Sequence, residues 1–236
     1  MHNINSSVTD RLSRGFGLSL LVVTFSMFTG LVAPSASAEV SAPMSAQDQA
    51  STRTQIVSVT RWQLINRRPY KVSCTSGGTV YQSVPQPSAS PPYNYLGRSG
   101  SNANCNIYNG YNGQAWCGHF ARFMWESGGT LNVPQVPRYY ASSQAWMNEA
   151  GSRWRAYGST LPQPGDVLVW TNNGDSSQGH VAVVTFVDTS KRAITYIGGN
   201  EATHGNSDSI VQHSDYWSNM GSSMTGKRFR GFASRF

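Results

Sequence analysis

Cys117 has the local surroundings of a nucleophilic thiol. It lies in the first turn of a predicted helix over residues 116–127, because the apolar positions of this segment recur with the 3.6-residue period of a helix. Gly128 and Gly129 are expected to end the helix. A cysteine in the first helical turn lies near the positive end of the helix dipole, and a nearby histidinium lowers the pKa of its thiol further. Backbone N–H groups there can also hold an oxyanion. We therefore predict Cys117 as a nucleophile; the alternatives are a buried structural thiol and a disulfide partner of Cys105.

Two further residues complete the predicted site. His180 opens a β-branched run, residues 180–187, after a turn that contains glycine, so we expect it at a strand end, facing the helix start. Asn200 follows Gly198 and Gly199 at the end of the next predicted strand, where an asparagine can accept the imidazole N–H and orient the ring. We predict His180 as the base and Asn200 as its orienter. The alternatives are a structural histidine and a turn asparagine.

The other histidines and the nearby aromatic residues carry weaker signals. His119 lies two residues beyond Cys117 on a different helix face, and His204 and His213 lie in polar segments, so none is expected in catalysis. No CxxC or HxxxH spacing supports a metal site, and no cofactor is expected. Aromatic platforms often bind sugar faces. We predict this substrate-binding role, with a core role as the alternative, for Trp116, Trp170 and Tyr196.

The elements that position these residues are predicted from the pattern that follows Asp166. Three short apolar runs, separated by polar turns, occupy residues 167–170, 180–187 and 193–197. Such runs indicate close antiparallel strands with hairpin-like turns. A helix followed by these strands predicts an α+β fold, in which the catalytic helix packs on an antiparallel β-sheet.

The chain before this region is expected to be less regular. Residues 39–52 are small and polar and are predicted to be a flexible leader, whereas residues 55–64 suit a short strand or a helix equally. Residues 75–113 are rich in Gly, Ser, Asn, Pro and Tyr, which indicates loops. The predicted organisation is a flexible leader and loop-rich extension over residues 39–104, followed by a catalytic domain over residues 105–236.

The first 38 residues have the pattern of a secretory signal peptide. Arg11 and Arg14 precede an apolar stretch at residues 15–32, and Ala-Ser-Ala at residues 36–38 fits a signal peptidase site. We expect cleavage before Glu39, with an uncleaved transmembrane anchor as the alternative. The protein is then secreted, extracellular or cell-wall associated, with no stable membrane insertion after cleavage.

Composition narrows the class of protein and its partners. Charged residues make up 12% of the chain, about half the ~25% of globular proteins, which excludes a coiled coil and disorder caused by charge repulsion. The net charge of +7 on an exported chain suits an anionic surface such as cell-wall polymer or phospholipid headgroups, and we do not expect nucleic acid as a partner. A monomer is expected. Export permits disulfides, so Cys74 and Cys105 are predicted to be able to pair, leaving Cys117 free.

Four blocks of sequence, in this order, resemble the CHAP domain, the family of cysteine, histidine-dependent amidohydrolases and peptidases. They are AWCGHF from residue 115, PGDV from 164, GHVAVV from 179 and YIGGN from 196. The resemblance implies a papain-like fold, in the superfamily that also contains NlpC/P60. It further implies cleavage of peptidoglycan, at the amide between muramic acid and the stem peptide or within the peptide, by Cys117, His180 and Asn200.

One position departs from the family pattern. Many members carry Glu two residues before the Asn, where this chain has Gly198. Glu201 is the competing orienter, but neighbouring residues of a regular strand face opposite sides, which favours Asn200. The departure also leaves an alternative function open, a non-catalytic wall-binding protein with the same fold. A structural secreted protein that dimerises through its odd cysteine is a third reading.

Overall fold

The structure is a computed structural model. It describes residues 44–66, 69–74, 77–86, 92–96, 105–109, 114–128, 133, 135–201 and 209–236; between residues 69 and 86 only the backbone is described. The predicted signal peptide and its cleavage site lie outside these residues. No helix in these ranges is long and apolar enough to cross a membrane.

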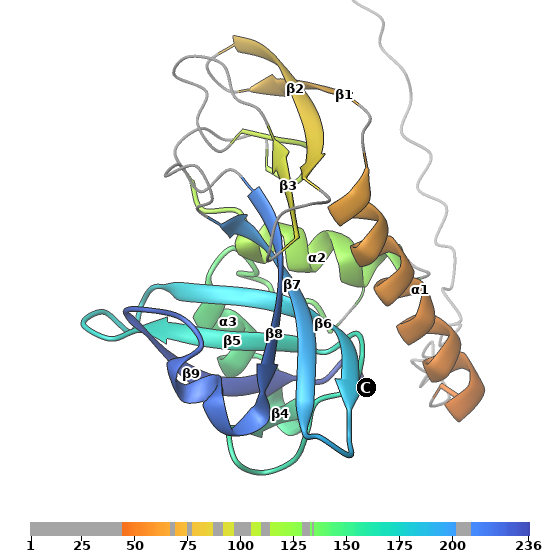
Figure 1. Cartoon of the computed structure of the whole chain (residues 1–236), viewed down its shortest axis with the longest axis vertical. Coiled ribbons are helices and arrows are strands. Elements are labelled where there is room, and N and C mark those ends of the chain that lie inside the picture. The colour runs from red at the N-terminus through yellow and green to blue at the C-terminus, as the bar shows by residue number, and fades with distance from the viewer. Residues whose placement is uncertain are drawn as a thin grey trace, which may run out of the picture. The chain divides into compact units, whose positions relative to one another are not determined.

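Helices and strands follow the order that Figure 1 labels. The elements are α1 (Ala46–Ile65), β1 (Pro69–Cys74), β2 (Gly77–Gln86), β3 (Tyr93–Leu96), α2 (Cys117–Ser127), α3 (Ser143–Asn148), η1 (Gly151–Arg153), β4 (Trp154–Ala156), β5 (Val167–Asn172), β6 (Gly179–Asp188), β7 (Ala193–Glu201), β8 (Ser209–Tyr216), η2 (Trp217–Ser222) and β9 (Lys227–Ala233). The strands form one sheet in the order β1-β2-β3-β8-β7-β6-β5-β9-β4, and every pair is antiparallel. The predicted α+β class is therefore confirmed.

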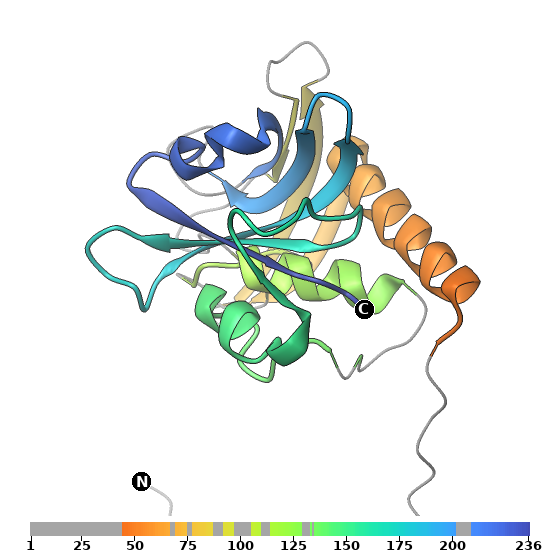
Figure 2. The same cartoon turned by 90° about the horizontal axis from the view of Figure 1, so that it is seen from below.

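Each face of the central strands buries its own core. Odd-numbered residues of β5 and β6, such as Val169 and Val181, pack with α2 and α3, whereas even-numbered residues such as Leu168 and Val184 pack with η2. This division follows from the period of two in a strand. Figure 2 shows α2 and α3 on one side of these strands and η2 on the other. The strands that carry His180 and Glu201 are thereby packed on both faces.

Residues 46–65 form the helix α1, so the structure differs from the flexible leader expected through Thr52 and resolves the open choice over residues 55–64. Ser45 caps this helix, because its hydroxyl accepts a hydrogen bond from the Asp48 backbone N–H at 3.2 Å. α1 contacts α2 and β6 along the buried residues Ile56, Thr60, Gln63 and Leu64.

A buried ion pair joins α1 to two distant parts of the chain. The Arg53 guanidinium lies 2.7 Å from the Asp166 carboxylate, which is 1% exposed. Asp166 also accepts hydrogen bonds from the backbone N–H groups of Gln163 and Arg235 and from the Ser234 hydroxyl. The carboxylate therefore connects α1, the turn before β5 and the C-terminal segment.

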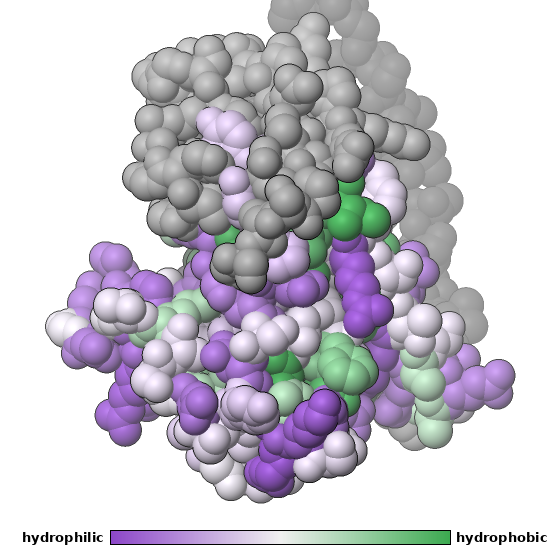
Figure 3. Space-filling model, viewed as in Figure 1, coloured by the Kyte–Doolittle hydropathy of each residue, from purple (hydrophilic) through white to green (hydrophobic). Residues whose placement is uncertain are grey.

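Two strands, β2 and β3, occupy part of the region over residues 75–113 that was expected to be loops. β2 pairs with β3, and β3 pairs with β8, so the extension adds to the edge of the catalytic sheet. On the face that Figure 3 shows, polar and apolar side chains of the described residues are interspersed. The large apolar side chains lie mainly in the two cores.

Candidate active site

Cys117 is the first residue of α2, and its side chain is almost completely buried. Burial raises the pKa of the Cys117 thiol, but its interactions with the His180 ring and with the backbone N–H groups of Val181 and Gly118 together outweigh burial, so the pKa falls below its ordinary value. No side chain caps α2, which leaves the first-turn N–H groups without a side-chain acceptor from the cap residue.

Glycines allow the close approach of backbone to this helix start. A Cβ at Gly199 would collide with the Trp116 ring and lie 2.9 Å from Phe120, so only glycine lets β7 pass so near to α2. A Cβ at Gly118 would collide with the backbone carbonyl of Tyr140. The contact at Gly199 thus lets the end of β7 pack closely against the start of α2.

His180 lies at the start of β6, opposite Trp170 on β5, and its side chain is 6% exposed. One ring nitrogen, Nε2, lies 3.1 Å from Glu201 Oε1. Burial lowers the pKa of His180, but the charge of Glu201 and the hydrogen bonds to Cys117 and Glu201 raise it to about 10. The lowered pKa of Cys117 and the raised pKa of His180 both favour the thiolate–imidazolium pair, with the Glu201 carboxylate beside the imidazole.

The structure places Glu201, and not the predicted orienter Asn200, against the His180 ring. Asn200 Oδ1 is buried and has no hydrogen-bond partner among the described residues. The reason is a β-bulge: Gly198 is opposite Val211, but Glu201 is opposite Ser209, which leaves one extra residue on β7. Asn200 adopts a left-handed φ of 66° within this bulge. The extra residue reverses the alternation, so Glu201 faces the side that Gly198 faces.

Gly198, the position of the family's usual Glu, leaves room for this replacement. A Cβ there would collide with Glu201 Oε1 and lie 2.8 Å from His180 Nε2. The carboxylate of Glu201 therefore fills the space into which a side chain at residue 198 would project.

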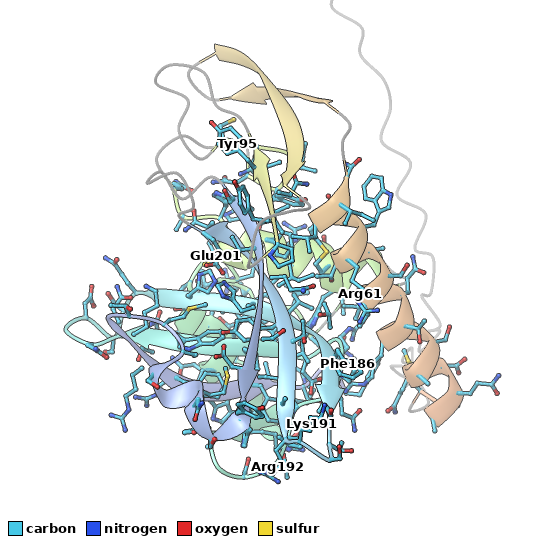
Figure 4. The ribbon with its side chains drawn as sticks, in the orientation of Figure 1. Arg61, Tyr95, Phe186, Lys191, Arg192 and Glu201 are labelled. Atoms are coloured by element: carbon cyan, nitrogen blue, oxygen red, sulfur yellow. The ribbon has the colours of Figure 1, made fainter. Side chains whose placement is uncertain are left out.

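A second histidine reaches the same carboxylate. His213 Nε2 on β8 lies 3.3 Å from Glu201 Oε2, although the sequence pattern assigned this histidine no role. Burial raises the pKa of Glu201, but His180 and His213 lower it to about 2, mainly through the charge of His180. Figure 4 shows Glu201 at the end of β7 far from the turn that carries Lys191 and Arg192. The imidazoles, not those cations, face the carboxylate.

The aromatic residues predicted to bind substrate are fully buried, which contradicts that role. Trp116 stacks on Tyr108 with ring centroids 5.5 Å apart, in the core beneath α2. Trp170 and Tyr196 lie on the opposite face of the sheet, in the core that includes η2. Proximity along the sequence placed these rings near the site, but their flat faces are covered by protein.

The remaining predictions concern histidines, metals and cysteines. His119 packs edge-on to Tyr140 at 5.1 Å, and His204 lies outside the described residues. Within the described ranges, no three acidic, histidine or cysteine side chains group as metal ligands. Cys105 is disulfide-bonded and Cys117 is free; the side chain of Cys74, the predicted partner of Cys105, lies outside the description.

Comparison with known proteins agrees with this geometry. Residues 108–200 match the family model of the CHAP domain, a segment that contains Cys117, His180 and Asn200 and ends one residue before Glu201. No curated protein and no solved structure matches the chain at a significant level. CHAP domains are typically hydrolases that act on peptidoglycan. Residues 108–200 of the chain are therefore similar to the CHAP domain.

Proposed function

We propose that the protein is an exported thiol hydrolase that cleaves an amide or peptide bond of peptidoglycan. The observation that carries this proposal is the grouping of Cys117 at the start of α2 with His180, which interacts with the thiol, and Glu201, whose Oε1 lies 3.1 Å from His180 Nε2. A binding protein that had lost its chemistry would have no need of a buried thiol, imidazole and carboxylate in contact. Burying charged groups is costly unless they are paired, so such a grouping suits a catalytic use.

The first half of the proposed reaction forms a thioester. The Cys117 thiolate attacks the carbonyl carbon of the amide, and the carbonyl electron pair moves to the oxygen, where N–H groups of the first turn of α2 stabilise the charge. When the carbon–nitrogen bond breaks, the His180 imidazolium gives its proton to the departing nitrogen. A free amine leaves, and the acyl group remains on sulfur.

The second half restores the enzyme. Neutral His180 takes a proton from water, whose oxygen attacks the thioester carbonyl. The carbon–sulfur bond then breaks, which releases the carboxylic acid and returns the thiolate and the imidazolium. Glu201 holds the His180 ring through Nε2 during both halves and stabilises its positive charge.

The decisive experiment is mass spectrometry of the soluble products released from purified peptidoglycan. We expect new amine and carboxyl ends from the intact protein and none from the Cys117→Ala variant, with closely similar thermal unfolding of both. Amidase activity leaves a free lactyl carboxyl on muramic acid, whereas endopeptidase activity leaves both new ends on peptide. Wild-type product release by Cys117→Ala would overturn the mechanism, and binding without products from the intact protein would favour the wall-binding alternative.

A further inference from the structure

The carboxylate of Glu201 is held by two imidazoles rather than one. His180 Nε2 lies 3.1 Å from Oε1, and His213 Nε2 lies 3.3 Å from Oε2. An ionised carboxylate only accepts hydrogen bonds, so each ring presents its Nε2–H to it. The two oxygens thus have different roles, because Oε1 orients the His180 ring and Oε2 is held by His213 on β8.

Glu201 has particular need of a second anchor. A glutamate side chain has three rotatable bonds, and ordering it costs conformational entropy. This side chain also starts from a bulge and reaches across the space above Gly198, which has no side chain to support it. With only Oε1 bonded, the carboxylate could rotate away from His180. The bond to His213 fixes both the position and the plane of the carboxylate.

His213 is itself rigidly supported. It is directly opposite Tyr196 in the β7–β8 ladder, and the two rings stack with centroids 5.3 Å apart and planes at 22°. The Tyr196 hydroxyl donates a hydrogen bond of 2.7 Å to Asp215, and the tyrosine is completely buried. The His213 imidazole therefore stacks on a buried tyrosine ring whose hydroxyl is held by Asp215.

We propose that His213 is a positioning residue of the catalytic site: by donating to Glu201 Oε2, it holds the carboxylate that orients His180. Its catalytic meaning rests on the proposed function, but its effect on the thiol does not require the substrate. The groups that face Glu201 are His180 and His213, and the titratable group that faces His213 from β7 besides Glu201 is Tyr196.

The test compares three variants of the full-length protein. His213→Phe keeps a ring on Tyr196 but removes the donor, whereas His213→Gln restores an N–H donor without an imidazole. Ser214→Ala is the matched control, because Ser214 is the next residue on β8 and contacts Thr195 instead of Glu201. For each, we would measure the rate of Cys117 alkylation by iodoacetamide against pH, thermal unfolding, and kcat and KM on peptidoglycan.

We expect His213→Phe to lower kcat between about tenfold and a hundredfold, the scale of a misplaced catalytic group, with KM little changed. The acid limb of its alkylation profile should move to higher pH, because a loosened carboxylate stabilises the His180 imidazolium less and the thiolate loses its partner's charge. His213→Gln should recover most of both effects, and Ser214→Ala should match the wild type.

Two outcomes would overturn the role of His213. An alkylation profile and kcat unchanged in His213→Phe would show that Oε2 needs no anchor. Equal losses in the Phe and Gln variants would show that the imidazole acts otherwise than as a donor. If His213→Phe does not fold, the role of His213 is judged from kcat and the alkylation profile of His213→Gln. Normal alkylation profiles without peptidoglycan cleavage by the wild type would instead refute the proposed substrate and leave this inference standing.

Discussion

Two buried carboxylates of this protein, Asp166 and Glu201, have cationic partners but very different surroundings. Asp166 accepts hydrogen bonds from Arg53, two backbone N–H groups and a serine hydroxyl, none of which changes protonation near neutral pH. Glu201 accepts from two histidines alone among the described residues. The first carboxylate is surrounded by fixed donors and joins three segments, whereas the second is held by groups that can exchange protons. The difference separates a structural carboxylate from one suited to catalysis.

The contrast between the two carboxylates predicts its largest effect on turnover at Glu201. We expect Glu201→Ala to lower kcat per folded molecule on the order of ten-thousandfold, the scale seen when the orienter of a catalytic histidine is removed. Stability near neutral pH should also fall, because His180 loses the carboxylate that stabilises its positive charge. The matched control is Asn200→Gly, which removes the amide but tolerates the left-handed backbone of the bulge and should cost far less. Turnover on the same peptidoglycan substrate is the measurement. A larger loss at Asn200 would restore the asparagine as orienter.

Substitution of Asp166 should lower stability but leave turnover unchanged. Asp166→Ala leaves the Arg53 guanidinium without its carboxylate in a largely buried place, so we expect the free energy of unfolding to fall by about 3 kcal/mol. Chemical denaturation measures this loss, and kcat per folded molecule should stay near the wild-type value. Asp175→Ala, at an exposed turn carboxylate, is the control and should change stability little. A thousandfold loss of kcat in folded Asp166→Ala would erase the contrast.

A smaller effect is expected at Gly198. In Gly198→Ala the new methyl group would collide with Glu201 Oε1, which is the end of a flexible side chain and can move aside. The backbone should therefore stay folded while the carboxylate leaves His180, lowering kcat between about tenfold and a hundredfold. Gly174→Ala, where a Cβ meets nothing within 4 Å, is the matched control. Unchanged kcat in Gly198→Ala would show that the carboxylate position is not critical.

The smallest expected effect is the pH dependence of the free energy of unfolding. Glu201 has its pKa lowered to about 2, so its contribution is present above its ordinary value of 4.5 and is lost as pH falls toward 2. His180 has its pKa raised to about 10, so its contribution is present below 6.5 and is lost as pH rises toward 10. The stability difference between wild type and Glu201→Gln should thus be largest between these ordinary values. Urea unfolding across pH tests this, and a difference that does not vary with pH would contradict the ion pair.

Local sequence patterns predicted one side of the site well and the other poorly. Cys117 and His180 each lie at the start of an element whose period is visible in the sequence, so their places could be predicted. Glu201 could not, because the bulge at Asn200 reverses the alternation on which the prediction relied. His213 lay in a segment read as a polar loop, and only the strand pairing of β8 with β7 brings it to Glu201.

The same reasoning explains the errors elsewhere in the fold. Half of the buried positions of α1 are polar, Thr60 and Gln63, so its apolar period is weak although its packing is real. Trp116, Trp170 and Tyr196 were judged by nearness along the chain, which does not tell whether a ring faces solvent or the core. The α+β class was predictable because it depends on the strong periods of α2 and of strands β5 to β7.

The bulge in β7 also separates the chemistry of the site from its linear motif. A carboxylate that extends from residue 198 and one that extends from residue 201 would claim the same volume, so a chain can use either place but not both at once. A sequence motif that requires an acidic residue at the position of Gly198 would classify this chain as a family member with an incomplete site. A three-dimensional template of sulfur, imidazole and carboxylate would class it as complete. Enzymes with inserted residues near catalytic strand ends are therefore best compared by where their functional atoms lie in space.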